Sequence, residues 1–140
     1  MISEYTISTD KSQLDIPLIQ QFLSQESYWA QNVPVEIVQR SIENSLCFGV
    51  YHQDQQVGFA RIITDQATFA YLSDVFILPE HRGKGLSKKL IETISNWSSL
   101  QGLRRWVLAT RDAHTLYEQF GFTALDKPEI FMQRKLIEKY

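Results

Sequence analysis

The alternation of apolar and polar positions changes several times along this chain, and each change predicts a different element. Residues 2–8 alternate as a strand does, while 47–52 and 57–64 are two apolar runs separated by a polar turn. Such a pair predicts a β-hairpin. The most apolar stretch is 68–78, and its unbroken run 75–78 is typical of a strand buried on both faces.

Helical spacing of apolar residues recurs in four places. Asp15, two residues before Pro17, predicts the start of a first helix, and Pro34 predicts the start of a second. An apolar stripe over 86–97 predicts the longest helix, which Gly102 is placed to end. Asp112 is placed to cap a fourth helix.

Three more strands are predicted at 105–110, 122–125 and 130–136. The resulting order is β-α-α-β-β-β-α-β-α-β-β. It predicts an α/β fold with one mixed, mostly antiparallel sheet of about six to seven strands and about four helices on its two faces. No repeat, linker or low-complexity stretch interrupts the pattern, so we expect a single domain over 1–140.

Composition excludes several classes of function. The chain is 44% hydrophobic and 21% charged, as ordinary globular domains are. A net charge of −2 argues against a general nucleic-acid binder, which usually carries a basic excess. No stretch approaches the ~20 apolar residues of a membrane span and the N-terminus lacks a signal-peptide pattern. We therefore expect a cytoplasmic protein without a membrane partner.

The metal-binding and thiol side chains are few. The single cysteine, Cys47, excludes an intrachain disulfide, and its apolar neighbours favour a buried structural thiol. The three histidines are scattered and have no metal-ligand spacing, so no metal site is expected. His52 and His81 receive no role.

Candidate chemistry concentrates where the most apolar strand ends, at Pro79. A short polar turn follows, and Gly83 and Gly85 then open the next helix. Glycines allow a ligand to approach the backbone closely, and a helix N-terminus offers free N–H groups and the positive end of a dipole. Four basic residues surround this point: Arg82, Lys84, Lys88 and Lys89. The pattern predicts a phosphate or pyrophosphate site.

Two common phosphate-binding fingerprints do not fit this loop. The dinucleotide pattern requires a glycine where Lys88 stands, and the P-loop pattern requires a glycine that is absent, which disfavours a nucleotide-binding domain. An Arg-Gly-x-Gly sequence after a buried strand instead resembles the acyl-CoA pyrophosphate loop of the GNAT superfamily of N-acetyltransferases. The family pattern Q/R-x-x-G-x-G/A is met at Arg82 and Gly85, and departs from it at Ser87.

A second segment, residues 113–122, resembles the helix-turn-strand pattern A-x-x-L-Y-x-x-x-G-F of the same superfamily. It matches at Ala113, Leu116, Tyr117, Gly121 and Phe122. The resemblance implies a helix beside the CoA thiol, with Tyr117 as the general acid that protonates the leaving thiolate. Many members have an asparagine just upstream, where this chain has 110–112, so the pantetheine contact of that asparagine is not assigned.

The resemblance implies acetyl-CoA as the cosubstrate and transfer of its acetyl group to the primary amine of a small molecule or peptide. The implied binding set is Val75, Phe76, Ile77, Arg82, Gly83, Lys84, Gly85, Leu86, Ser87, Lys88, Ala113, Leu116 and Tyr117. The alternative is a non-catalytic acyl-CoA-binding module or sensor, which would not need Tyr117. The identity of the acceptor stays open, as does assembly into a homodimer.

Proton removal and acceptor binding are less determined by the sequence. Asp74 is a carboxylate in an apolar strand, where it needs a partner or a catalytic task. We favour a structural pair with Arg61, with a base role for Asp74 or an acidic acceptor on Arg61 as alternatives. Tyr28 and Trp29 are candidates for the wall of an acceptor pocket or for core positions. His114, three residues before Tyr117, is a candidate proton relay or simply an exposed or capping histidine.

Overall fold

The computed structural model describes residues 2–140, and its strands form one sheet in the order β1-β2-β3-β4-β5. All neighbouring strands are antiparallel except β5, which is parallel to β4. This confirms the predicted mixed, mostly antiparallel sheet. The strands are β1 Tyr5–Ser8, β2 Leu46–His52, β3 Gln55–Thr64, β4 Phe69–Ile77 and β5 Arg105–Leu108.

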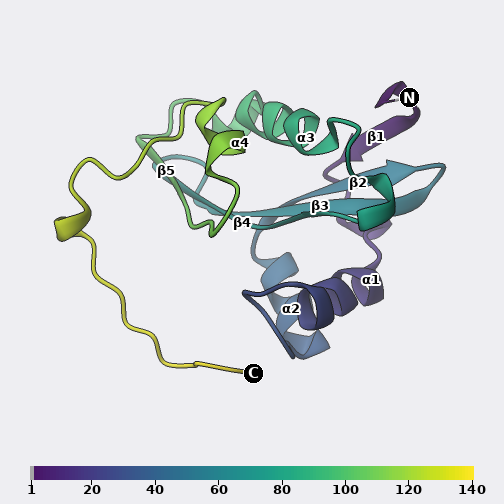
Figure 1. Ribbon diagram of the computed structural model, residues 1–140, viewed down its shortest axis with the longest axis horizontal. Coiled ribbons are helices and arrows are strands. Elements are labelled where there is room, and N and C mark those ends of the chain that lie inside the picture. Colours follow the sequence, from purple (N-terminus) through teal and green to yellow (C-terminus); the bar gives the residue numbers. More distant parts are fainter. Residues whose placement is uncertain (1) are drawn as a thin grey trace.

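The helices lie on both faces of the sheet, as the element order predicts. One face carries α3 and α4, and the other carries α1 and α2 (Figure 1). Their bounds are α1 Ile16–Gln21, α2 Val35–Glu43, α3 Leu86–Ser95 and α4 His114–Glu118. No helix within residues 2–140 has the length and apolar character needed to cross a membrane.

The helix ends agree with the sequence only in part. Asp15 caps α1 as predicted, because its Oδ1 accepts a hydrogen bond from the Leu18 N–H at 3.1 Å. Asp112 does not cap α4, since the helix begins at His114 and Thr110 Oγ1 accepts from the Ala113 N–H instead. Gly102 does not end α3 either; with φ of 78° it turns the chain toward β5, well after the helix has ended.

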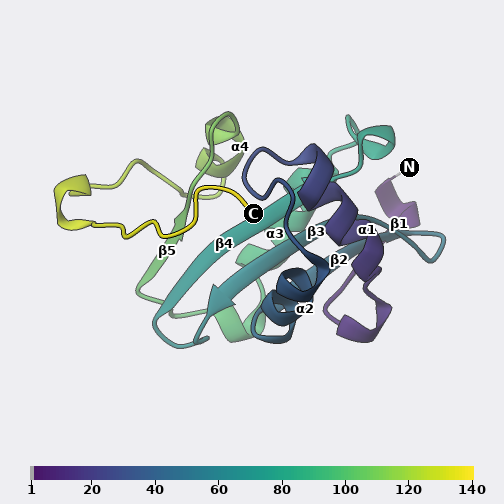
Figure 2. The same cartoon turned by 90° about the horizontal axis from the view of Figure 1, so that it is seen from below.

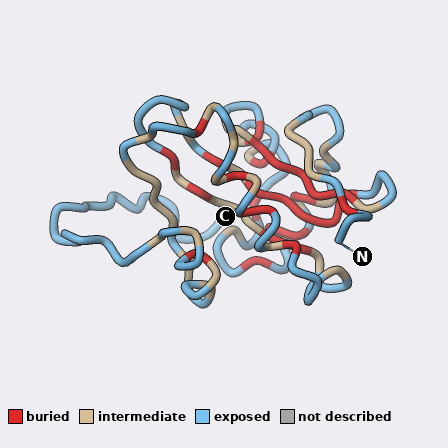
Figure 3. The backbone as a smooth tube through the Cα atoms, turned by 90° about the horizontal axis from the view of Figure 1, so that it is seen from above, coloured by how far each residue is buried: buried red, intermediate tan, exposed pale blue. Residues whose placement is uncertain are grey.

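Each face of the sheet has its own apolar core. Alternate residues of β2 point to opposite faces, so Phe48 packs against α3 while Cys47 packs with α1 and α2. Buried positions follow the central strands (Figure 3). Burial raises the pKa of the Cys47 thiol to about 11, which agrees with a structural rather than a nucleophilic cysteine.

A wide turn follows α1 directly. Residues Phe22–Glu26 form a π-helical turn, closed by a hydrogen bond of 3.0 Å from the Ser27 N–H to the Phe22 carbonyl. The buried Ser27 hydroxyl then donates to the Leu23 carbonyl at 2.6 Å and accepts from the Ala30 N–H at 3.0 Å. These bonds fix the loop that holds residues 28 and 29.

Strand β4 contains a β-bulge. Phe76 pairs with Phe59 but Ser73 pairs with Arg61, so one extra residue of β4 stands opposite β3 between these pairs. Asp74 sits in the bulge with φ of 54°, in the left-handed region that Asp and Asn tolerate better than most residues. The bulge therefore redirects this part of β4.

Strands β4 and β5 pair over a short distance only. The pairing joins Phe69–Leu72 to Arg105–Leu108 and ends there. The second half of β4, residues 73–77, has no β5 residue beside it. This leaves one edge of the strand open toward the space between β4 and β5.

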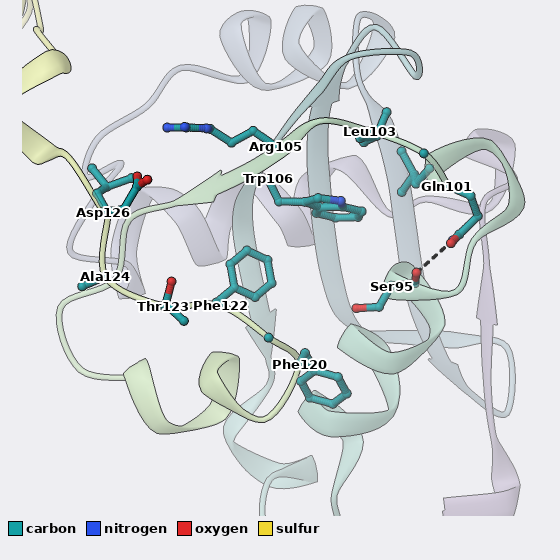
Figure 4. A pocket seen from close by; sticks show the side chains of 14 residues that line it. Ser95, Gln101, Leu103, Arg105, Trp106, Phe120, Phe122, Thr123, Ala124 and Asp126 are labelled. Carbon is teal, nitrogen blue, oxygen red and sulfur yellow. Dashed lines mark hydrogen bonds between the residues drawn. The ribbon is translucent and has the colours of Figure 1, made fainter.

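The two predicted C-terminal strands, 122–125 and 130–136, are wrong for this structure. Beyond α4 the chain forms only a 3₁₀ turn at Pro128–Ile130. Residues 123–126 still line a cavity with Trp106 of β5 (Figure 4), and the chain after them extends away from the body of the molecule (Figures 1 and 2). The alternating pattern of 130–136 suits a strand, but no other part of residues 2–140 pairs with it. The sheet accordingly has five strands, fewer than the six to seven predicted.

Candidate active site

A small cavity of about 150 Å³ lies at the N-terminus of α3, and we call it the loop pocket. Gly83 and Gly85 adopt φ of 78° and 80°, which only glycine adopts without strain. A Cβ atom on either glycine would meet no protein atom closer than 3.8 Å, so the space above the loop is open to a ligand. The lining residues are Ile77, His81, Arg82, Gly83, Gly85, Leu86, Ser87 and Lys88.

The start of α3 is suited to bind an anion. Gly85 is the N-cap residue, and no side chain caps the first N–H groups of the helix. Arg82 is held at the pocket by a hydrogen bond of 2.8 Å from its Nε to the Ile77 carbonyl. Free N–H groups, the positive end of the helix dipole and a guanidinium together favour a phosphate group.

Lys84 is the one predicted loop residue that does not line the loop pocket. Its Nζ donates to the Tyr5 hydroxyl at 3.3 Å, and the ammonium also lies 5.8 Å from the centre of the Tyr5 ring. His81, to which the sequence assigned nothing, does line the pocket, and its Nδ1 lies 2.8 Å from the Tyr5 hydroxyl. Tyr5 is 76 residues away in the sequence, so no local pattern could reveal these contacts.

A larger cavity of about 360 Å³ lies between β4, the end of β5 and the start of α4, and we call it the central pocket. It brings together residues predicted separately as catalytic, cofactor-binding and acceptor-binding. Those lining it are Tyr28, Trp29, Asp74, Val75, Ala113 and Tyr117. Because Val75 lines the central pocket and Ile77 lines the loop pocket, the open edge of β4 connects the two cavities.

Tyr117 projects from α4 and is only 8% exposed. Burial raises the pKa of its hydroxyl to about 12, and the nearby Tyr28 and Asp112 contribute to that rise. The hydroxyl is therefore fully protonated at neutral pH. Such a group can donate a proton or a hydrogen bond inside the central pocket, but it cannot act as a base there.

Asp74 forms the predicted pair with Arg61. Its Oδ2 accepts from Arg61 Nε at 2.7 Å, and its Oδ1 accepts from Trp29 Nε1 at 2.8 Å. The two charged side chains are 8% and 15% exposed, for Asp74 and Arg61 respectively. Arg61 also donates to the Ser45 hydroxyl at 3.1 Å. Both carboxylate oxygens are thus engaged, as a structural pair requires.

The early aromatic loop is attached to a distant part of the chain. The Tyr28 hydroxyl accepts from the Arg111 N–H at 3.0 Å, and the Arg111 guanidinium lies 3.8 Å from the centre of the Tyr28 ring. The Trp29 ring meets the Tyr28 ring edge to face, with centroids 5.0 Å apart. Tyr28 and Trp29 are therefore pocket-wall residues, 40% and 41% exposed, and not core residues.

Residues 43–124 match a family model described as an acetyltransferase (GNAT) domain. The chain belongs to the GNAT family of acetyltransferases. A protein of Gibberella zeae classed as an acetyltransferase is 34% identical over 136 residues, which cover 81% of this chain and 76% of that protein.

Solved structures agree with this membership. A crystal structure of a protein from Xanthomonas campestris pv. campestris, classed as a GNAT acetyltransferase, is 53% identical with a TM-score of 0.93. The match covers 94% of this chain and 93% of that chain. The part of this chain that the match does not cover is shorter than residues 123–140. The match therefore includes some of this C-terminal segment.

A GNAT acetyltransferase of Elizabethkingia anophelis, solved with acetyl-CoA bound, shares the fold with a TM-score of 0.66. The likeness covers 88% of this chain and 78% of that one, at 14% identity, so it concerns the fold alone.

Some residues predicted for this GNAT site lie elsewhere. The Phe76 side chain is buried in the α1–α2 core, stacked on Phe22 with ring centroids 4.0 Å apart, so only its backbone faces the site. Leu116 packs against the opposite core and lines neither pocket. His114 is exposed and lines a third cavity beside Tyr117.

The sequence also missed residues that line the central pocket, above all Tyr71 and Arg111. The one signal in the sequence for Arg111 was its position just before the second motif. Within residues 2–140, no group of three or more His, Cys, Asp or Glu side chains could hold a metal ion.

Proposed function

We propose that this GNAT acetyltransferase transfers the acetyl group of acetyl-CoA to a primary amine of a small molecule or peptide. The amine would attack the thioester directly while both substrates are bound. One observation carries the proposal: the open edge of β4 runs from an uncapped, glycine-rich helix start to a cavity that contains a buried, protonated tyrosine. Acetyl-CoA has a pyrophosphate near one end and a thioester at the other, and this arrangement offers a site for each.

The loop pocket would hold the pyrophosphate of the cosubstrate. The N–H groups at the start of α3 would bind its oxygens, with Ser87, Lys88 and Arg82 around them. The pantetheine arm would then run along the open edge of β4 as an added strand, using the backbone of residues 75–77. Backbone recognition of this kind explains why the buried Phe76 side chain does not interfere.

Tyr117 would act as the general acid. When the amine nitrogen attacks the carbonyl carbon, a C–N bond forms and the C–S bond breaks, and sulfur keeps the electron pair. The Tyr117 hydroxyl would give its proton to that sulfur. The nitrogen would lose its extra proton to solvent, and Tyr117 would recover a proton from solvent afterwards. Backbone N–H groups near Val75 would help to polarise the carbonyl as negative charge develops on its oxygen.

The acceptor would bind in the central pocket against Tyr28 and Trp29. Because Asp74 already pairs with Arg61 and Trp29, the Arg61 guanidinium is not directed at an acidic acceptor. The acceptor side therefore consists of two aromatic residues, a neutralised ion pair and Arg111, whose guanidinium already lies over the Tyr28 ring. Such walls suit an amine with an apolar or aromatic neighbour.

The test is release of free thiol from acetyl-CoA in the presence of a panel of amines. We expect turnover with at least one amine and none with the panel omitted. Acetyl-CoA should also raise the melting temperature, whereas ATP and NAD should not. Binding of acetyl-CoA without thiol release by any amine would favour the acyl-CoA sensor and count against the proposal.

A further inference from the structure

The central pocket contains a cation whose N–H groups the protein itself does not use. Arg61 gives its donors to Asp74 and to the Ser45 hydroxyl, and it does not line the pocket. Arg111 does line the pocket. Within residues 2–140, no hydrogen bond or ion pair engages its guanidinium, and its backbone N–H alone donates to a side chain. All five N–H groups of the Arg111 side chain therefore remain available to a ligand.

The Arg111 guanidinium is positioned by an aromatic ring and not by a counter-ion. It lies 3.8 Å from the centre of the Tyr28 ring, while the Tyr28 hydroxyl accepts from the Arg111 backbone N–H at 3.0 Å. A guanidinium placed against a ring face keeps its N–H donors, which point outward in its own plane. The contact thus fixes the position of a positive charge before any ligand binds, which lowers the entropy cost of binding.

Asp112 supplies a negative charge to the same pocket. Its side chain is exposed, lines the central pocket and forms no ion pair with Arg111 or with any other cation of residues 2–140. Its charge contributes to the raised pKa of Tyr117, so its field reaches the hydroxyl proposed as the acid. The pocket therefore offers an unpaired group of each sign in addition to the neutralised pair of Asp74 and Arg61.

We propose that the acceptor amine also carries a carboxylate, and that Arg111 binds this carboxylate. The inference rests on the proposed function, because it names the acceptor class of the same transfer. A guanidinium fork matches a carboxylate with two parallel N–H···O bonds. The ammonium form of the acceptor would be attracted to Asp112 beside Tyr117, and its apolar part would lie against Tyr28 and Trp29. Amino acids with an apolar or aromatic side chain have this distribution of groups.

The phosphates of acetyl-CoA do not account for the unused guanidinium. The loop pocket and the central pocket have no lining residue in common, so Arg111 is separate from the proposed pyrophosphate site. A doubly charged phosphate on the acceptor would meet stronger repulsion from Asp112 than a singly charged carboxylate does. The charges of this pocket therefore favour an amino carboxylate.

Matched acceptors isolate the contribution of the carboxylate. Phenylalanine, leucine and alanine are each compared with their amides, and kcat/KM is measured by thiol release at saturating acetyl-CoA. We expect the better amino acids to exceed their amides by about 10-fold, mainly through KM, because a bidentate pair at an open pocket is partly screened by water. Amides that are equal to the amino acids or better would overturn the proposal.

Arg111→Gln shows whether this residue causes the preference. The substitution removes the charge but keeps the backbone N–H that binds the Tyr28 hydroxyl, so the aromatic wall is retained. We expect the amino acids to lose about 10-fold in kcat/KM and the amides to change by less than about 2-fold. Comparing wild type and variant also cancels the different amine pKa values within each pair. Arg111→Lys keeps the charge without the fork and should recover part of the loss.

Arg104→Gln is the matched control, because Arg104 is also exposed but lines neither pocket. It should retain the preference for amino acids. An equal loss for amino acids and amides in Arg111→Gln would make Arg111 a residue that only positions Tyr28. A weaker affinity of that variant for acetyl-CoA, measured by calorimetry, would assign it to the cosubstrate. Either result overturns the proposal.

Equilibrium binding separates this inference from the proposed function. In calorimetry with CoA present, N-acetylphenylalanine should bind about 10-fold more tightly than its amide, and Arg111→Gln should remove the difference. If this holds while no amine releases thiol, the carboxylate site stands and the proposed function fails. Thiol release that depends on neither the carboxylate nor Arg111 would leave the proposed function standing and refute the site. Equal binding of the two ligands, or binding of neither, would also refute it.

Discussion

The loop pocket and the central pocket are neighbours on one strand, but they are constructed in different ways. The loop pocket consists of backbone: two left-handed glycines and an uncapped helix start, all within residues 77–88. The central pocket consists of side chains from distant parts of the chain. Its contacts join residues 45 positions apart, as between Trp29 and Asp74, and 83 apart, as between Tyr28 and Arg111.

The two kinds of construction differ in the ligands that they can recognise and in how readily substitutions alter them. A pyrophosphate is the same in every acyl-CoA, and a fixed set of N–H groups is sufficient to bind it. An acceptor amine differs from enzyme to enzyme, and a wall of side chains can change without altering the backbone. We therefore expect substitutions in the loop pocket to abolish cosubstrate binding and substitutions in the central pocket to have smaller, acceptor-specific effects.

The largest expected effect is that of Gly85→Asp. The substitution places a carboxylate at the proposed pyrophosphate site and forces a side chain into a left-handed backbone. Like-charge contact at a binding site costs several kcal/mol, so we expect acetyl-CoA affinity to fall by about 10³-fold, measured by calorimetry.

Gly102→Asp is the matched control for this variant. Gly102 has φ of 78° and open space around its Cβ position, but it lies outside the loop pocket. It should suffer a similar backbone strain and bind acetyl-CoA normally. Equal loss of affinity in both variants would mean that strain, and not the phosphate site, is being measured.

The next effect in size is that of Tyr117→Phe, which tests whether the two pockets act as one site. We expect kcat to fall by about 10²-fold, at the low end of the range for general acid catalysis, with little change in acetyl-CoA affinity. Tyr51→Phe is the control, because that buried tyrosine also has a pKa raised to about 12 but lines neither pocket. A kcat equal to wild type in Tyr117→Phe would make Tyr117 a core aromatic.

Asp74→Asn should act on stability more than on catalysis. It removes the charge that pairs with Arg61 but keeps a residue that tolerates the left-handed backbone. Because Arg61 loses its buried partner, we expect the unfolding free energy to fall by about 2 kcal/mol. In urea unfolding, Asp54→Asn should cost little, since Asp54 has φ of 67° but lies in an exposed turn.

The activity of folded Asp74→Asn decides between the two roles of this residue. For a structural pair, kcat/KM per folded molecule should stay within about 2-fold of wild type and keep its pH dependence. A stable variant with a flattened pH profile would instead assign Asp74 as the base.

The smallest expected effect is on the pH dependence of the unfolding free energy, to which the two buried tyrosines contribute only at alkaline pH. Burial raises the pKa of Tyr117 and Tyr51 to about 12, above the value near 10 of an exposed tyrosine. The folded state thus holds these protons more tightly than the unfolded state. Stability from this source is complete below about pH 10 and is lost as the pH rises toward 12.

Urea unfolding at several pH values between about 8 and 11 measures this loss. Tyr51→Phe and Tyr117→Phe should each make the decline above about pH 10 less steep, because each removes one of the two titrating hydroxyls. An unchanged decline in both variants would show that other groups cause it.

The sequence predicted the loop pocket well and the central pocket only as separate candidates. Glycine positions, a strand end and a helix start are local, so spacing along the chain reveals them. The partner of Tyr28 is not local, and neither is that of Lys84, whose ammonium lies at Tyr5 instead of in the loop pocket. The Asp74–Arg61 pair could be anticipated because each residue interrupts an apolar strand and the two strands are neighbours.

The C-terminal residues show why the strand count was too high. An alternating pattern specifies which face each side chain would take, but it does not specify the strand that pairs with it. Residues 130–136 have the pattern but pair with no strand of the sheet, although the Phe131 ring lies 5.0 Å from the Arg105 guanidinium of β5. A pattern can thus favour an extended conformation for a segment without specifying a partner strand for it.

The π-helical turn at Phe22–Glu26 has a consequence for how new acceptor specificity could arise. An α-helix advances about 100° per residue, so a chain one residue shorter here would close as an ordinary helical turn and rotate the loop beyond it. Tyr28 and Trp29 are held by hydrogen bonds to Arg111 and Asp74, so such a shortening would strain both bonds although no lining residue had been replaced. The length of this turn, and not only the residues on the wall, therefore determines the shape of the acceptor side.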